Sequence, residues 1–247
     1  MKKKNFNLKV VLVEPNGPIN IGSIARLCSN FEVNELRIVS PNCDIFSLEA
    51  KKMALKGQKY IDNCKIFNSI ERAIFDCDLV VATCGRIDLS KDIDCESPER
   101  ITKWISSFKN INNLGVLFGR EDRGLSNSEL LLAHKIFNIK TSQNYPSLNL
   151  SHAVSIILYE LNKCSTNNLK KELNMFNLAS SKQIYDSFVE LEKLLIRTGY
   201  LLEHTSNSKI SKFKKFVLRA KTSSHEINVL RGIVHQINWF LKNSKGD

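Results

Sequence analysis

Residues 114–133 read LGVLFGREDRGLSNSELLLA, and they contain the strand-to-helix turn that decides the fold. The apolar run 114–119 predicts a buried strand, and four consecutive charged residues follow it. Ser126 with Glu129 three positions later is the pattern of a capping box at a helix N-terminus. The stretch therefore predicts a strand, a charged loop and a short helix, in that order.

The same alternation continues on both sides of this stretch, over residues 1–164. Strands are expected at 8–14, 35–39, 64–67, 78–83, 114–119 and 135–139, and helices at 22–31, 46–55, 70–75, 98–108, 126–133 and 150–161. Apolar strands separated by helices are typical of an α/β fold with a parallel sheet covered on both faces. Ligands of such sheets bind at the carboxyl ends of strands. The loops expected there are 15–20, 84–88, 120–124 and 141–149.

The last part of the chain differs from the first. The polar run CSTNN at 164–168 predicts a linker, and apolar residues then recur at helical spacing around Phe188 and again around Val234, with a basic stretch between them. We therefore expect an α/β domain at 1–164, followed at 165–247 by a linker and a small, basic, all-α extension.

Positive charge is in excess and is concentrated in this extension. The chain has 36 Lys and Arg against 25 Asp and Glu, and residues 165–247 hold 14 of the former and 7 of the latter. Such a surface favours a polyanionic partner such as nucleic acid. A solvated lysine-rich surface is the alternative explanation.

Several other chemistries lack their sequence signatures. Seven cysteines without a Cys-x-x-Cys pair indicate reduced thiols in a soluble, cytoplasmic protein, and no apolar run reaches the roughly 20 residues that span a bilayer. Ser23 directly after Gly22 breaks the P-loop pattern, and no G-x-S-x-G is present. The five histidines lack metal-ligand spacing, so we expect neither a metal nor a membrane partner.

Three motifs carry the most information: NIGSIAR at 20–26, FGREDRGL at 118–125 and SLNLSHA at 147–153. Together, in this order, they resemble the three motifs of the SpoU (TrmH-like) ribose 2′-O-methyltransferases of the SPOUT class. The tail, with IYDSFVELEKLLIRTGY at 184–200 and SKFKKFVLRA at 211–220, is similar to that of the TrmJ-type group of this family. With the tail, the resemblance spans nearly the whole chain.

The resemblance implies a parallel-sheet domain whose C-terminal segment forms a trefoil knot. It also implies a homodimer that binds S-adenosyl-L-methionine in the knot, each site being completed by the partner. The expected reaction is methylation of the ribose 2′-OH of tRNA at anticodon-loop position 32, on cytidine, uridine or both. The alternatives are the same chemistry on another tRNA nucleotide or on rRNA, or an RNA-binding protein without catalysis.

The resemblance also assigns catalytic roles to Arg26, Asn20, Glu121 and Asn149. A guanidinium hardly ever loses its proton, so we expect Arg26 to orient a phosphate and stabilise the developing alkoxide, and the proton acceptor stays unassigned. A helix-surface arginine is the alternative. N-capping alone would explain Asn20 and Asn149. Glu121 is expected to hold its loop together, and Gly22 to permit a close backbone approach.

Two further sets of residues complete the expected site. The cofactor-binding set is Thr83, Cys84, Gly85, Gly119, Ile139, Pro146, Ser147 and Leu148, in which Cys84 stands where related sequences tend to have a small hydroxyl residue. The RNA-binding set is Arg86, Arg120, Arg123, Lys212, Lys214, Lys215 and Arg219.

Overall fold

The computed structural model describes residues 6–85, 95–108, 111–142, 144–166, 179–219 and 222–243. The chain divides into two compact units, Met1–Met175 and Phe176–Asp247, and each unit has its own buried apolar cluster. The expected domain boundary at residue 164 falls within the last turn of helix α7 (Leu150–Thr166). Residues 164–166 of the expected linker are therefore helical, and residues 167–168 lie outside the described residues.

The first unit is built on a seven-stranded sheet with the order β3-β2-β1-β6-β4-β7-β5. The strands are β1 (Asn7–Val13), β2 (Glu35–Val39), β3 (Lys65–Phe67), β4 (Leu79–Cys84), β5 (Cys95–Glu96), β6 (Asn113–Phe118) and β7 (Lys135–Asn138). Every pairing among these strands is parallel, which confirms the predicted α/β fold. Strand β5 was not predicted, because two residues at a sheet edge are too short to show a pattern. The knot implied by the resemblance stays a prediction.

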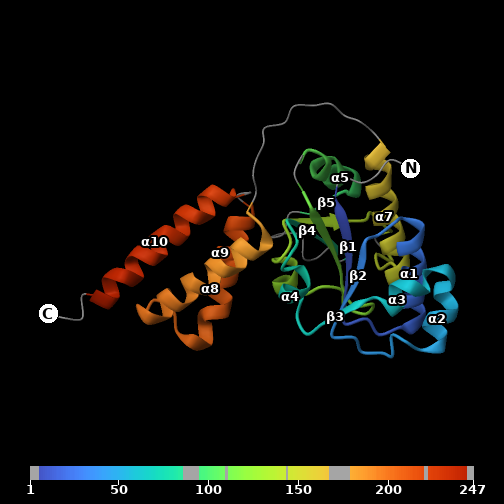
Figure 1. Cartoon of the computed structure of the whole chain (residues 1–247), viewed down its shortest axis with the longest axis horizontal. Helices are drawn as coiled ribbons and strands as arrows, with labels where there is room; N and C mark the ends of the chain where they lie inside the picture. Colours follow the sequence, from blue (N-terminus) through green and yellow to red (C-terminus); the bar gives the residue numbers. More distant parts are fainter. Residues whose placement is uncertain are drawn as a thin grey trace. The chain divides into compact units, whose positions relative to one another are not determined.

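Helices cover both faces of this sheet. They are α1 (Pro18–Asn30), α2 (Leu48–Ala54), a 3-10 helix η1 (Leu55–Gly57), α3 (Gln58–Asp62), α4 (Ile70–Ile74), α5 (Pro98–Ser106), α6 (Asn127–Leu130) and α7. Figure 1 shows α1, α2, α3 and α7 together on one side of the sheet and α4 on the other. Side chains of α4 and α6 share a buried cluster with side chains of β1, β4 and β6.

Helix α1 begins earlier than predicted, at Pro18 rather than Gly22. Gly17 is its N-cap residue and makes no side-chain capping bond, so Asn20 lies inside the first turn and is not the cap. The predicted close approach at Gly22 is confirmed. A Cβ added there would lie 2.3 Å from the Ala50 carbonyl oxygen, so only glycine lets α1 pack this tightly on α2.

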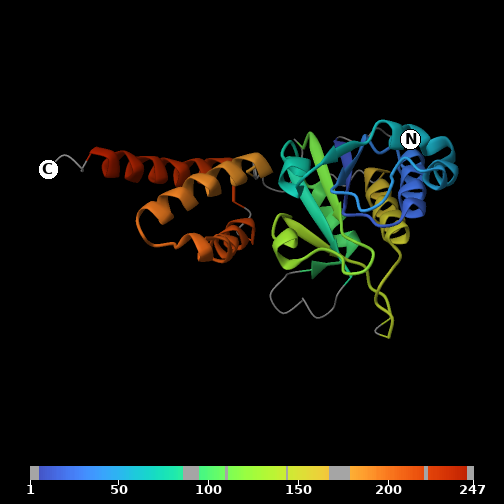
Figure 2. The same cartoon turned by 90° about the horizontal axis from the view of Figure 1, so that it is seen from below.

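The second unit consists of α8 (Ser181–Arg197), α9 (Glu203–Arg219) and α10 (Ser224–Asn243), which Figure 2 shows in orange and red. The basic stretch expected between two helices is itself the helix α9. Its buried side chains Ser206, Ile210 and Val217 recur at helical spacing, and the lysines between them obscure this pattern in the sequence.

Within the described residues, no helix is long and apolar enough to cross a membrane. The same residues contain no cluster of three or more His, Cys, Asp and Glu side chains able to hold a metal ion.

Candidate cofactor and RNA site

A cavity of about 320 Å³ lies at the carboxyl ends of β4, β6 and β7. Its lining comes from three loops and the start of α7: residues 83–85, 118–125, Phe137, Ile139, 146–148, Leu150 and Ala153. This is the place at which a parallel sheet is expected to bind its ligand, and the volume suits a small molecule. Three of the four predicted ligand loops contribute to it. The fourth, 15–20, does not line the cavity but is hydrogen-bonded to a loop that does.

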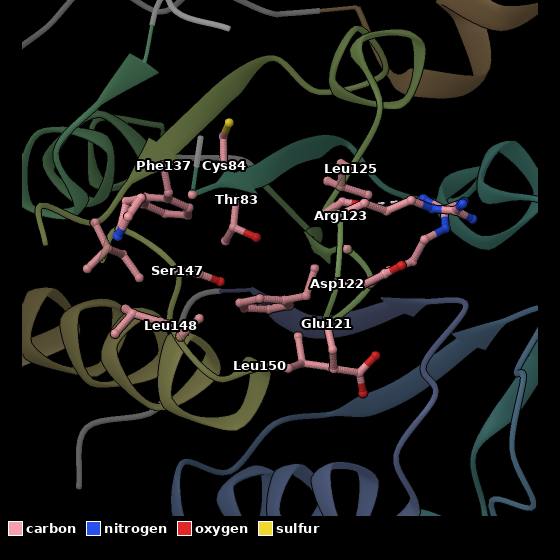
Figure 3. Close-up of a pocket in the computed structure, with 18 residues that line it drawn as sticks. Thr83, Cys84, Glu121, Asp122, Arg123, Leu125, Phe137, Ser147, Leu148 and Leu150 are labelled. Atoms are coloured by element: carbon pink, nitrogen blue, oxygen red, sulfur yellow. Dashed lines mark hydrogen bonds between the residues drawn. The ribbon is translucent and has the colours of Figure 1, made fainter. Parts of the chain in front are cut away.

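All eight residues predicted to bind the cofactor line this one cavity. In Figure 3 the Thr83 and Ser147 hydroxyl groups point toward the space between the loops, whereas the Cys84 sulfur points away from them. Thr83 Oγ1 donates to the Leu117 carbonyl oxygen at 3.2 Å. Cys84 thus faces the cavity with its backbone rather than its side chain, and the hydroxyl group of this segment comes from Thr83.

The loop 119–125 folds back on itself beside the cavity. The Gly124 amide donates to the Arg120 carbonyl oxygen at 3.0 Å, and a Cβ added to Gly119 would lie 2.3 Å from the Gly124 carbonyl carbon. Only glycine fits at position 119, because an added atom would meet backbone, which cannot yield as a flexible side chain does.

One chain of hydrogen bonds joins the three sequence motifs. Glu121 Oε1 accepts from Asn20 Nδ2 at 3.0 Å, and Asn149 Nδ2 donates to Asn20 Oδ1 at 3.0 Å. Glu121 also accepts from the backbone amides of Asn16 and Gly17, at 3.0 and 3.2 Å. Three of the four predicted catalytic residues therefore lie together, and their contacts shape the loops around the cavity.

Asn149 also caps the helix that follows it. Its Oδ1 accepts from the Ser151 amide at 2.9 Å and from the Ser151 hydroxyl at 2.7 Å. The capping explanation is therefore confirmed for Asn149, together with its contact to Asn20. It fails for Asn20, whose side chain bonds other side chains instead.

Arg120, one of the predicted RNA contacts, is bonded within the protein in this structure. The Arg120 side chain is only 9% exposed and is bonded to Glu14 and Glu129. Four of its five N–H groups bond the two carboxylates and the fifth bonds the Gly124 carbonyl oxygen, so none is left to offer a phosphate. Arg123, three residues further on, has a side chain that is 64% exposed and lies 3.2 Å from Glu14, so it can reach a ligand outside the loop.

Glu14 and Glu129 are functional candidates that the sequence reasoning missed. Hydrogen bonding by Arg120 holds the pKa of Glu14 below its ordinary value. Burial raises the pKa of Glu129, but hydrogen bonds from Arg120 and Ser126 outweigh it and leave this pKa lowered too. Glu14 directly follows the first strand, at the sheet edge where the site lies. This position could have identified Glu14 as a candidate from the sequence.

Arg26, the fourth predicted catalytic residue, is separate from the cavity. It is exposed on α1 and does not belong to the lining. Among the described residues, its side chain makes no hydrogen bond or ion pair with this chain. Its guanidinium is therefore available to bind a phosphate group of a ligand.

The remaining RNA-binding predictions fall on two segments. Arg86 lies outside the described residues. Lys212 and Lys214 lie on α9, where Lys212 is exposed and Lys214 Nζ is 5.9 Å from the centre of the Tyr185 ring. Lys215 and Arg219 lie on the same helix. The structure thus brings the predicted cofactor residues together and leaves the predicted RNA contacts spread over both units.

A parallel sheet with an apolar, loop-lined cavity at its carboxyl edge is typical of α/β proteins that bind a small ligand or cofactor. The chain belongs to the SpoU rRNA methylase family, whose model matches residues 7–159. The predicted family and its cofactor, S-adenosylmethionine, are confirmed, and the chain is an RNA methyltransferase.

Two curated relatives cover almost the whole chain. A tRNA (cytidine-2′-O-)-methyltransferase TrmJ from Methanocaldococcus jannaschii is 35% identical over 222 residues, which are 89% of this chain and 94% of that protein. A tRNA (cytidine/uridine-2′-O-)-methyltransferase TrmJ from Escherichia coli is 29% identical over 247 residues, which are 98% of this chain and 99% of that protein.

Solved structures agree with the fold. The crystal structure of TrmJ from Z. mobilis matches with a TM-score of 0.80 at 26% identity, over 93% of this chain and 98% of that one. A structure described as giving insights into 2′-OH methylation of C/U34 on tRNA matches with a TM-score of 0.52 at 23% identity, over 65% of this chain and 91% of that one. The second match is too distant to show more than the fold.

Proposed function

We propose that this protein methylates the ribose 2′-OH of tRNA at position 32 of the anticodon loop, on cytidine, uridine or both. The observation that carries the proposal is the single cavity lined by all eight predicted cofactor residues, next to the hydrogen-bonded chain Glu121–Asn20–Asn149. Relatives that methylate tRNA 2′-oxygens align along almost the whole chain, second unit included, and this supports tRNA as the substrate. The cytoplasm, where tRNA is abundant, is the expected location.

The cavity suits S-adenosylmethionine. Leu125, Ile139 and Leu148 provide apolar surface for a purine, and the glycine-containing loops expose backbone donors and acceptors beside it. When bound, the cofactor supplies an electrophilic methyl group on its sulfonium. The protein then needs no metal; its residues bind, orient and exclude water, and positioning alone can supply several kcal/mol of the barrier.

Arg26 is proposed to hold the phosphate next to the target ribose and to stabilise negative charge on the 2′-oxygen as its proton leaves. Because Arg26 lies outside the cavity lining of its own chain, we propose that a second copy brings it to the site. Exposed apolar residues on α1 and α7 support such a dimer: Ile19 is 52% exposed, Ile156 36% and Tyr159 57%. The basic extension is proposed to contact phosphates around the anticodon stem.

The test is methyl transfer from labelled S-adenosylmethionine to bulk bacterial tRNA, with the modified nucleotide mapped by mass spectrometry. Label at position 32 is expected. Label at position 34, elsewhere in tRNA or on rRNA would support 2′-O-methylation as the reaction but would contradict position 32 as the target. Tight tRNA binding without label on any RNA would favour a binding protein.

Arg26→Ala should abolish this label while leaving S-adenosylmethionine affinity unchanged, since Arg26 does not line the cavity. Arg72→Ala, an exposed arginine on α4, is the matched control and should keep wild-type activity. At a cofactor concentration too low to occupy the Gly119→Ala site, mixing Arg26→Ala subunits with Gly119→Ala subunits should restore about a quarter of wild-type activity, because half the dimers then contain one intact shared site. No recovery would contradict the shared site.

A further inference from the structure

Arg120 joins two segments that are far apart in the sequence. Its Nε and Nη2 donate to the two carboxylate oxygens of Glu14, at 2.7 and 2.6 Å. Its Nη1 and Nη2 donate to the two oxygens of Glu129, at 2.9 and 2.8 Å. Glu14 directly follows β1, and Glu129 lies in α6. The planar guanidinium thus binds both carboxylates in bidentate fashion, the geometry that gives strong and directional ion pairs.

The loop that carries Arg120 forms a wall of the cavity, and each residue from Gly119 to Leu125 belongs to the lining. Arg120 Nη1 also donates to the Gly124 carbonyl oxygen at 3.3 Å, so the side chain spans its own loop as well. Glu121 ties the next position to the 16–20 segment. Two adjacent side chains therefore fix this wall, one to the end of β1 and one to the start of α1.

The anchor point at Glu14 has an uncommon backbone conformation, with φ of 45°. A residue other than glycine in this region costs of order 1 kcal/mol and persists only where its surroundings hold it. At Glu14 the amide donates to the Val39 carbonyl oxygen at 2.8 Å, while the carboxylate is held by Arg120 and Arg123. The strand end is thus fixed from both sides, which gives Arg120 a rigid support.

We propose that Arg120 is a positioning residue for the cofactor: clamped between Glu14 and Glu129, it sets the conformation of the 119–125 wall to which S-adenosylmethionine binds. The inference rests on the proposed function of the cavity. It replaces the predicted RNA contact with a role inside the protein, and it adds Glu14 and Glu129 to the residues on which catalysis depends.

The test compares Arg120→Lys with the wild-type full-length protein. An ammonium keeps the charge but cannot fork onto two carboxylates. The KM for S-adenosylmethionine is expected to rise about tenfold, with kcat at saturating cofactor changed by less than about threefold. The Kd for tRNA should not change, because the Arg120 guanidinium is bonded within the protein. Glu129→Gln, a milder change, should raise the same KM by a smaller factor.

Arg37→Lys is the matched control. Arg37 is also a buried arginine, with a side chain 3% exposed, that bonds Asp76 in bidentate fashion at 2.6 and 2.9 Å and does not line the cavity. It should lower the melting temperature and leave the KM for S-adenosylmethionine unchanged. A cofactor KM that also stays unchanged in Arg120→Lys and Glu129→Gln would overturn the proposal.

A fall in tRNA affinity alone in Arg120→Lys would also overturn the proposal, by restoring the RNA contact. A wild-type protein that does not bind S-adenosylmethionine would instead refute the proposed function itself, which separates the two failures.

Discussion

At Gly119 the backbone of the cavity wall passes so close to itself that a Cβ would lie 2.3 Å from the Gly124 carbonyl carbon. We expect Gly119→Ala to push the two strands of the loop apart and to weaken S-adenosylmethionine binding at least tenfold, at a cost of about 1–3 kcal/mol of stability. Isothermal titration of the cofactor and chemical denaturation measure the two effects.

Gly232→Ala is the matched control for this substitution. Gly232 lies in α10, and no atom is within 4 Å of its added Cβ. Alanine there should stabilise the protein by about 0.5–1 kcal/mol, because it loses less conformational freedom in a helix, and should leave cofactor binding unchanged. Equal cofactor affinity in the two variants would show that the 119–125 loop tolerates rearrangement.

The sequence motifs predicted which residues belong to the site, but they did not predict which of these residues contact one another. Arg120 and Arg123 read alike, as cations of one charged loop. The structure separates them because Glu14 and Glu129 bind Arg120 from segments that no local pattern connects to the loop. Glu121 and Asn20 were identified through motifs, whereas the bond between them depends on how the sheet brings β1 and β6 together.

At the scale of elements, apolar runs identified the buried strands well, because a strand covered on both faces needs no polar alternation. The hydrophobic pattern predicted secondary structure least well where tertiary contacts determine which residues form a helix. The short helix α3 was not predicted, and α9 was hidden by lysines that surround a narrow buried stripe. Most of the predicted cofactor residues lie near strand ends, so their position at the carboxyl edge of the sheet could be predicted wherever the strand was.

The clamp around Arg120 makes the 119–125 loop sensitive to acid. Glu14 and Glu129 both have lowered pKa values in the folded protein, so their contribution to stability is present above about pH 4.5 and is lost as the pH falls through the lowered native values. Glu129→Gln should therefore reduce the loss of stability as the pH falls below about 4.5. Urea unfolding at a series of pH values measures this, and identical pH profiles for wild type and variant would count against it.

At the scale of the whole molecule, the cavity belongs entirely to the first unit, and the basic helices belong to the second. A protein ending at Met175 is expected to keep S-adenosylmethionine affinity within about twofold while its tRNA Kd rises at least tenfold, since phosphate contacts dominate RNA affinity. Titration of both ligands, with a circular dichroism check of folding, tests the division of roles. Unchanged tRNA affinity would place the RNA contacts in the first unit.

The hydrogen bonds that assemble the site join residues 101 to 129 positions apart, from Asn20–Glu121 to Asn20–Asn149. Contacts of such long sequence separation form slowly, because the chain loses much conformational entropy before the contacts contribute any stabilising free energy. The complete network can therefore form only after the ribosome has synthesised Asn149. A nascent chain that ends before residue 146 lacks part of the cavity lining, so we expect it not to consume the methyl donor during synthesis.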